Sequence, residues 1–496
     1  MAKGMKSLAK DTAIYGISSI LGKFLNWLLT PFYTFYLATE ADNGIVTNFY
    51  AWSSLLLVIL TYGMETGYFR FANKNRAEAP KVYGNSLISV GFTSVLFALL
   101  CALFTKPIAG LLDYTANPEF ITMMGLIVAL DAFSSIIFAH LRYKNRPIKF
   151  AVLKFLYVVL NIFFNLFFLM VCPWLMQKAP SLVSWFYVPG YGVGYVFISN
   201  LLATVIQTLI LSKHLFEAEF KLDLKLLNSI LKYSFPLLIL GIAGIANQNL
   251  DKILFPYLRE GNLGKSELGI YGVTSKMSMV MMMFTQAFRF AYEPFVFAQH
   301  KEKNSLKVYA DAMKYFIIFS LIIFIGMVLY VDVFKLIIKR NFWVGLDVLP
   351  IILVSFIFQG IYFNLSLWYK LTDKTMYGAW FSIVGTIIIV MGNIIFVPLY
   401  SYWGSAWSAF GCYFIIMLIS YFVGQKYMPI KYDMKTIGLY TGVTIVLYII
   451  SLFIKTPYFI LNVALKSVLM VVFLTLLVKR DFPLKSIPYV NKFFNK

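Results

Sequence analysis

Residues 232–258 read KYSFPLLILGIAGIANQNLDKILFPYL and show the pattern on which the whole chain is built. The stretch is long enough to cross the apolar core of a bilayer, for which a helix needs about 20 residues. In its C-terminal half it nevertheless carries a group of five polar residues. These are Asn247, Gln248, Asn249, Asp251 and Lys252. No helix surrounded by lipid tolerates such a group, so we expect these side chains to face a cavity or other helices.

Similar apolar runs recur from end to end of the 496 residues, of which 60% are hydrophobic and only 13% charged. A soluble protein would carry about 25% charged residues. Because backbone groups must be satisfied inside lipid, runs of this length predict helices rather than barrel strands. We therefore expect an all-α polytopic membrane protein with about 14 transmembrane helices. The expected spans lie near 11–37, 43–69, 82–104, 117–141, 150–171, 189–211, 233–258, 267–290, 308–330, 346–369, 376–397, 401–424, 436–454 and 459–478.

The basic residues give this topology an orientation. Most of the 43 Lys and Arg residues fall on one side of the expected spans, and membrane proteins keep such residues in the cytoplasm. We therefore place both termini in the cytoplasm and read the basic N-terminus as a leader into the first span. The net charge of +21 is then a result of topology, which removes nucleic acid as a partner. One outer segment, VFKLIIKRNFW at 333–343, breaks the rule with three basic residues.

The span at 232–258 has a counterpart at 15–37, which reads YGISSILGKFLNWLLTPFYTFYL. With an offset of 225 positions, five residues of one copy meet identical residues of the other. The pairs are Gly16 and Gly241, Leu25 and Leu250, Leu29 and Leu254, Pro31 and Pro256, and Gly44 and Gly269. In addition, FRFA at 69–72 returns at 288–291. The matches predict an internal repeat of six spans.

A repeat with an even number of spans enters the membrane the same way twice. We therefore expect two six-helix lobes related by a pseudo-two-fold axis along the membrane normal, with a binding site between them near the midplane. The expected domains are an N-terminal lobe at 1–212, a cytoplasmic linker at 213–225 and a C-terminal lobe at 226–426. Residues 427–496 add two extra spans and a cytoplasmic tail.

Four stretches carry a resemblance to a known family. They are YGISSILGKFLNWLLTPFYTFYL, GMETGYFRF, ALDAF…AHLRYKNRP and KYSFPLLILGIAGIANQNLDKILFPYL. Their layout resembles the oligosaccharide flippases of the multidrug/oligosaccharidyl-lipid/polysaccharide (MOP) exporter superfamily, and within it the bacterial flippases for O-antigen or capsule repeat units. The resemblance covers nearly the whole chain, including the two extra spans.

This resemblance implies a function and a location. The chain would be a flippase in the bacterial inner membrane that moves polyprenyl-pyrophosphate-linked oligosaccharides to the periplasmic leaflet by alternating access. Its partners would be that lipid-linked oligosaccharide, membrane lipid and other polysaccharide-assembly proteins. The sequence contains no nucleotide-binding motif of the Walker type, so we expect the energy to come from the membrane potential or from a gradient of H⁺ or Na⁺. No other cofactor is expected.

Charged and polar residues within the spans are the candidates for binding the substrate. A pyrophosphate needs lasting positive charge, for which we select Lys23, Lys252 and Lys276. Their polar neighbours complete the expected site. These are Asn26, Asn247, Gln248 and Asp251. When the two repeats are aligned, Gln248 corresponds to Lys23 and Asp251 corresponds to Asn26. A purely structural interpretation, in which Asp251 pairs with Lys252 or Lys276, stays open.

Four further residues have secondary roles in this scheme. Asp131 and Glu65 lie in apolar surroundings, where a carboxylate can take up a proton or help to bind Na⁺, so they are candidates for ion coupling; a salt bridge to Lys23 is the alternative. Arg70 and Arg289 occupy matching positions of the repeated FRFA, at the cytoplasmic ends of their spans. We expect them at the cytoplasmic mouth of the cavity, as membrane anchors or as attractors of the incoming pyrophosphate.

Other functions fit the sequence less well. An enzyme acting on sugars needs acid and base residues or a metal, but the three histidines are far apart in sequence, and the three cysteines, Cys101, Cys172 and Cys412, form no metal motif. A cation-coupled multidrug antiporter of the same superfamily would have twelve spans and a carboxylate-rich cavity. A flippase for a lipid-linked peptidoglycan precursor shares the fourteen-span plan and stays the second alternative.

Overall fold

The computed structural model describes residues 2–299 and 305–481, which are almost entirely helical. The helices of the N-terminal half are α1 (Ala2–Tyr36), α2 (Glu40–Thr61), α3 (Met64–Lys74), α4 (Ala79–Leu103), α5 (Thr105–Leu111), α6 (Glu119–Tyr143), α7 (Pro147–Leu166), α8 (Cys172–Lys178) and α9 (Val193–Leu211). Those of the C-terminal half are α10 (Leu224–Leu258), α11 (Gly261–Met277), α12 (Met279–Gln299), α13 (Ser305–Leu329), α14 (Val331–Ile337), α15 (Leu349–Leu365), α16 (Leu367–Leu371), α17 (Met376–Tyr400), α18 (Tyr402–Tyr427), α19 (Met434–Phe453) and α20 (Phe459–Arg480).

Every expected span coincides with one of these helices or with two consecutive ones. Within the described residues, twelve helical segments are long and apolar enough to cross a membrane. The other two expected spans correspond to α1 and to α11 with α12, which carry Lys23 and Lys276. The prediction of an all-helical polytopic membrane protein is confirmed.

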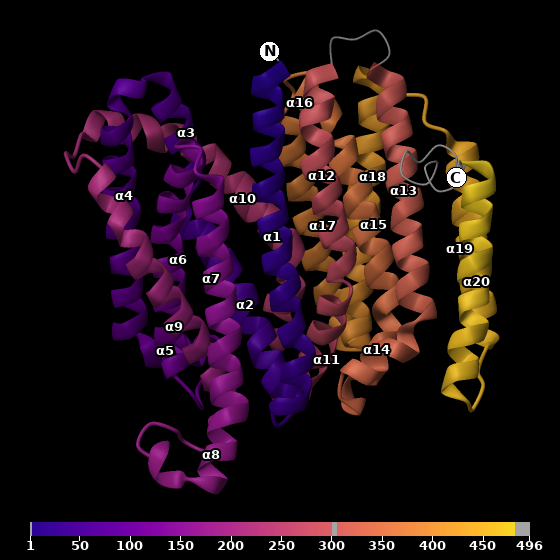
Figure 1. Cartoon of the computed structure of the whole chain (residues 1–496), viewed down its shortest axis with the longest axis horizontal. Helices are drawn as coiled ribbons and strands as arrows, with labels where there is room; N and C mark the ends of the chain where they lie inside the picture. Colours follow the sequence, from indigo (N-terminus) through magenta and orange to yellow (C-terminus); the bar gives the residue numbers. More distant parts are fainter. Residues whose placement is uncertain (1, 300–304, 482–496) are drawn as a thin grey trace, which may run out of the picture.

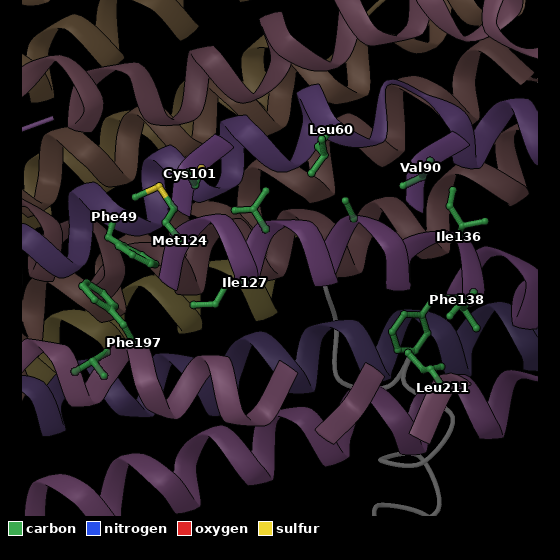
Figure 2. Packing of buried hydrophobic residues seen from close by; sticks show 14 of the residues in the cluster. Phe49, Leu60, Val90, Cys101, Met124, Ile127, Ile136, Phe138, Phe197 and Leu211 are labelled. Atoms are coloured by element: carbon green, nitrogen blue, oxygen red, sulfur yellow. The ribbon is translucent and has the colours of Figure 1, made fainter. Parts of the chain in front are cut away.

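Two groups of helices stand side by side (Figure 1). The buried apolar side chains of the first group form one cluster, which runs from Leu29 to Ile230. Figure 2 shows part of this cluster, in which Phe49 of α2 and Phe197 of α9 stack with ring centroids 3.7 Å apart. The second group has clusters of its own between Phe255 and Leu477. Separate apolar cores give each lobe its own stability and allow the lobes to move relative to each other.

The extra helices α19 and α20 stand at the edge of the second group (Figure 1). They pack on α13, and Asp332 of α14 holds α20 further, because it accepts hydrogen bonds from Lys466 at 2.6 Å and from Asn462 at 2.7 Å, both on α20. Burial by itself would raise the pKa of Asp332, but Lys466 and Lys335 hold it below its ordinary value. The clamp ties the added helices to the C-terminal lobe at one end.

The expected linker is packed against the N-terminal lobe. The backbone N–H of Glu219 donates to the Pro80 carbonyl at 3.0 Å, and Asp223 accepts from Lys81 at 2.6 Å. Asp223 also caps the start of α10, and these contacts lower the pKa of its carboxyl to about 2. The domain boundaries themselves stay a prediction.

The two lobes meet through a reciprocal contact between α2 and α11. These two helices pack against each other as extensively as α17 and α18 do within the C-terminal lobe. A Cβ atom on Gly44 would strike the Lys265 carbonyl, and one on Gly269 would strike the Glu40 carbonyl. Both pairs are related by the offset of 225 found in the sequence. An isologous contact of this kind lies on a two-fold axis, so the pseudo-axis passes between the two glycines. Thr47 and Gly272, one turn further along, are matched in the same way.

Gly44→Ala and Gly269→Ala should each destabilise the protein, because a backbone carbonyl of the opposite helix already occupies the position of the added methyl group. The two helices must then separate. We expect a loss of about 1–3 kcal/mol, as for other overpacked contacts, seen as earlier thermal unfolding in detergent. Gly110→Ala in α5 is the matched control, since a Cβ there meets no atom within 4 Å. Equal unfolding temperatures for all three variants would contradict the close contact.

Candidate functional site

A cavity lies between the lobes, next to the α2–α11 contact. Its first part, of about 350 Å³, is walled mainly by α1, α2, α6, α7 and α9, with residues of α11 and α12 at its border, and we call it the N-lobe half. Its second part, of about 320 Å³, is walled mainly by α2, α10 and α11, with α15 and α18 behind them, and we call it the C-lobe half. The two halves share six lining residues. These are Lys23, Tyr50, Ser54, Lys276, Met279 and Met282.

All seven residues selected as substrate ligands line this cavity. Lys23, Asn26 and Lys276 line the N-lobe half, together with Asp131. The C-lobe half is lined by Lys23 and Lys276 again and by the whole polar group of α10. That group consists of Asn247, Gln248, Asn249, Asp251 and Lys252. The repeat thus places polar residues of both lobes around one space, although their binding of a substrate stays a prediction.

Lys23 and Lys276 face the cavity without an acidic hydrogen-bond partner in the described residues. Lys23 Nζ donates to Oε1 of Gln286 on α12 at 2.8 Å. Lys276 Nζ lies 6.0 Å from the ring centre of Tyr33 and 5.9 Å from that of Tyr50. A neutral amide and two aromatic rings stabilise a cation less than a carboxylate does. Both lysines therefore leave most of their positive charge available to an anion.

Lys252 has the structural role that the sequence had left open. Its Nζ donates to both carboxylate oxygens of Asp251, at 2.8 and 2.9 Å, and to the Gln248 carbonyl at 3.2 Å. Asp251 is 3% exposed and also accepts from the Tyr271 hydroxyl at 2.7 Å. The pair is electrically neutral, so Lys252 offers an anion less than Lys23 or Lys276 does.

Asn247 lies one helical turn before Asp251, but its side chain bonds to another helix instead. Its side-chain amide donates to the Ser382 carbonyl at 3.1 Å, and its oxygen accepts from Thr386 at 2.9 Å. The amide therefore joins α10 to α17. It lines the cavity as part of a packed helix contact.

The secondary candidates lie outside the cavity, with the exception of Asp131. Glu65 accepts from Arg142 at 2.6 Å. The Arg70 guanidinium lies 4.1 Å from the ring centre of Tyr233 on α10. Arg289 pairs with Glu293 at 3.0 Å. Each of these charges therefore has a partner among the described residues.

Several polar residues of the cavity are not apparent from the sequence alone. Tyr157 and Asn161 of α7 and Asn200 of α9 line the N-lobe half, and Gln286 holds Lys23. The available signal was an amide or a hydroxyl inside an apolar run. It is weak, because Asn393 is also buried within a span and only bonds the Ile389 carbonyl and Ser405.

Comparisons with known proteins agree with this architecture. A family model for polysaccharide biosynthesis proteins matches residues 8–294, more than half of the chain. The chain belongs to this family. A comparison with curated protein sequences finds no significant match.

Solved structures share the fold of this polysaccharide biosynthesis family member. The chain is similar to the lipid II flippase MurJ in an inward closed conformation, with a TM-score of 0.74 and 13% identity over 94% of this chain and 99% of that one. It is also similar to an inward-facing MATE multidrug transporter of the MOP superfamily (TM-score 0.62, 12% identity, 82% and 94% covered). For an outward-facing MATE transporter the TM-score is 0.55, with 14% identity and 84% and 95% covered. These likenesses show that the chain has the fold of these transporters.

Removing Asp251 should destabilise the protein strongly, because Lys252 would remain as an unpaired cation among buried helices. For Asp251→Ala we expect a loss of about 3–5 kcal/mol, measured by chemical unfolding. The double change Asp251→Asn with Lys252→Met should recover most of it. Asp311→Ala, which breaks a more exposed pair with Lys314, is the control. If Asp251→Ala and the control lose equally little, the pair has no structural role.

Proposed function

We propose that this protein is a flippase for polyprenyl-pyrophosphate-linked oligosaccharide repeat units. One observation supports it above the others: Lys23 and Lys276 line a single cavity on the pseudo-axis and have only neutral hydrogen-bonding or aromatic partners among the described residues. Cations held inside a membrane without counter-charge are costly. A pyrophosphate would supply the missing negative charge. The family to which the chain belongs agrees with a sugar-containing cargo.

The transport step follows from the position of the contacts. In this conformation the lobes are closed at the α2–α11 contact. Separation of these helices on one side and contact on the other would expose the cavity alternately to the two leaflets. The lipid chain would stay in the membrane. An apolar groove of about 600 Å³ between α13, α15, α18 and α19 has the volume to hold part of a hydrocarbon chain.

Asp131 is the better of the two candidates for coupling to H⁺ or Na⁺. It lines the cavity and has no hydrogen-bond partner in the described chain, although the charge of Lys154 acts on it. Glu65 is held by Arg142, so it is less free to exchange a proton or an ion. We further propose that the protein works with other polysaccharide-assembly proteins in the bacterial inner membrane.

The peptidoglycan precursor remains a second candidate cargo. The likeness to the lipid II flippase MurJ extends over nearly the whole chain, and both cargo classes contain a pyrophosphate that the two lysines could bind. Binding of each cargo to the purified protein separates the candidates.

Lys23→Ala and Lys276→Ala should each weaken binding of farnesyl diphosphate by about tenfold or more, because each removes a charge-assisted contact worth about 1.5–3 kcal/mol. Binding is measured by calorimetry on protein in nanodiscs. Lys23→Arg should retain most of the affinity. Lys339→Ala, which removes a positive charge outside the cavity, should bind like the wild type. Unchanged affinity in both cavity variants would contradict the proposed pyrophosphate site.

The proposed topology has its own test. Reporter domains fused to either terminus should give the signal of a cytoplasmic location. The expected number of spans is even, and most basic residues lie on the side of the termini, which is the cytoplasmic side. A periplasmic readout at either end would exclude the proposed orientation.

A further inference from the structure

The helical segment made of α7 and α8 is longer than a membrane span requires. It runs from Pro147 to Lys178, 32 residues, or about 48 Å at 1.5 Å per residue, whereas the apolar core of a bilayer is about 30 Å thick. Figure 1 shows α8 beyond the ends of the neighbouring helices, at the end of the molecule opposite to the N-terminus. In the proposed orientation this is the outer side. We call residues 172–190, which contain α8 and the loop after it, the outer hairpin.

The outer hairpin is almost uncharged and exposes large apolar side chains. Its sequence, CPWLMQKAPSLVSWFYVPG, has a single charged residue, Lys178. Four large apolar side chains have more than half of their surface exposed. These are Trp174 at 58%, Leu182 at 61%, Trp185 at 80% and Val188 at 63%. A patch of this kind indicates a surface that binds a membrane or another protein.

The opposite face of the outer hairpin is packed against α9, which fixes the exposed face. Tyr187 is 8% exposed and stacks on Tyr195 of α9, with ring centroids 5.0 Å apart. The backbone N–H of Val188 donates to the Tyr195 hydroxyl at 2.6 Å. The indole N–H of Trp185 donates to the Leu182 carbonyl at 3.1 Å. The loop is therefore a folded element with one buried and one exposed apolar face.

A row of aromatic rings connects the outer hairpin to the membrane-spanning part of α7. Phe163 of α7 is 56% exposed within an apolar span, so it faces lipid. Its ring lies 6.3 Å from that of Phe167, which lies 6.3 Å from that of Phe186. Phe186 in turn contacts the Trp185 ring at 4.8 Å. The loop thus folds back from the tip of α8 toward the membrane, and Trp185 continues a surface that begins in lipid.

We propose that the outer hairpin is a membrane anchor, which inserts Leu182, Trp185 and Val188 into the phospholipid interface of the outer leaflet. Tryptophan is enriched at this level of membrane proteins, because its ring is apolar and its N–H is polar. The continuous aromatic row favours lipid over a protein as the occupant. Charge favours it too: the hairpin has no carboxylate, and Lys178, one helical turn after Trp174, can reach a lipid phosphate.

The anchor would act on the N-terminal lobe, because the hairpin continues α7 and packs on α9. Insertion in the outer leaflet would hold the outer end of this lobe at one depth while the lobes move relative to each other. This role does not depend on which cargo the protein carries.

The test measures the depth of the hairpin in a nanodisc with a nitroxide attached at Ser184→Cys. The three native cysteines are buried, so the label reaches the introduced thiol. Collisions of the nitroxide with oxygen, which concentrates in lipid, are compared with collisions with a water-soluble nickel chelate. The oxygen-to-nickel ratio should lie above that of Ala77→Cys, in the exposed loop before α4, and below that of Leu96→Cys on the exposed face of α4. Ser181→Cys repeats the measurement at a second exposed position.

Substitutions in the labelled protein test which side chains hold the hairpin in lipid. Trp185→Ser combined with Leu182→Ser should lower the ratio at Ser184→Cys toward that of Ala77→Cys, since the apolar contacts are lost. Trp380→Ser, which removes an equally exposed indole from α17, is the matched control and should leave the ratio unchanged. A ratio equal to that of Ala77→Cys before these substitutions would place the hairpin in water and overturn the anchor. Few collisions with both reagents would show that a protein covers the hairpin, which also overturns it.

Discussion

The approach of α2 to α11 at Gly44 and Gly269 is the contact on which the arrangement of the two lobes depends. Because each glycine faces a backbone carbonyl of the opposite helix, the helices come closer here than side chains would allow. The same two helices then carry Tyr50 and Lys276 into the cavity, so the contact also fixes where the polar residues of the two halves meet. A single symmetric contact thus joins the lobes and positions the site.

The distribution of counter-charges gives the site its character. Several other charges of the described chain neutralise each other: Asp251 with Lys252, Glu65 with Arg142, and Asp332 with Lys466. Lys23 and Lys276 bond or contact neutral groups instead. Inside a membrane, where isolated charge is costly, this difference marks the place at which a charge from outside the protein is needed. Paired charges stabilise the fold, whereas these two remain available to a ligand.

Much of this could be read from the sequence, because charge and hydropathy act locally. Lys23 and the polar group of α10 stand out within apolar runs, and the repeat indicated that they face one space. The amides did not stand out in this way, since Asn161 and Asn393 look alike in sequence. Asn161 lines the cavity, whereas Asn393 bonds within its own helix and to Ser405. An amide can satisfy itself on a neighbouring backbone carbonyl, and only its surroundings decide whether it does.

The sequence by itself determined the all-helical membrane fold, the positions of its long apolar helices and the residues that could not face lipid. These properties follow from the water-free interior of the bilayer, which every stretch of chain must meet on its own. Only the tertiary structure decided the partners: Asp251 binds Lys252 and not Lys276, Glu65 binds Arg142 and not Lys23, and Lys23 bonds Gln286 across 263 positions. Partners far apart in sequence, such as Lys23 and Gln286, are chosen by the packing of whole helices, because the side chains that pack on one face depend on every neighbouring helix at once.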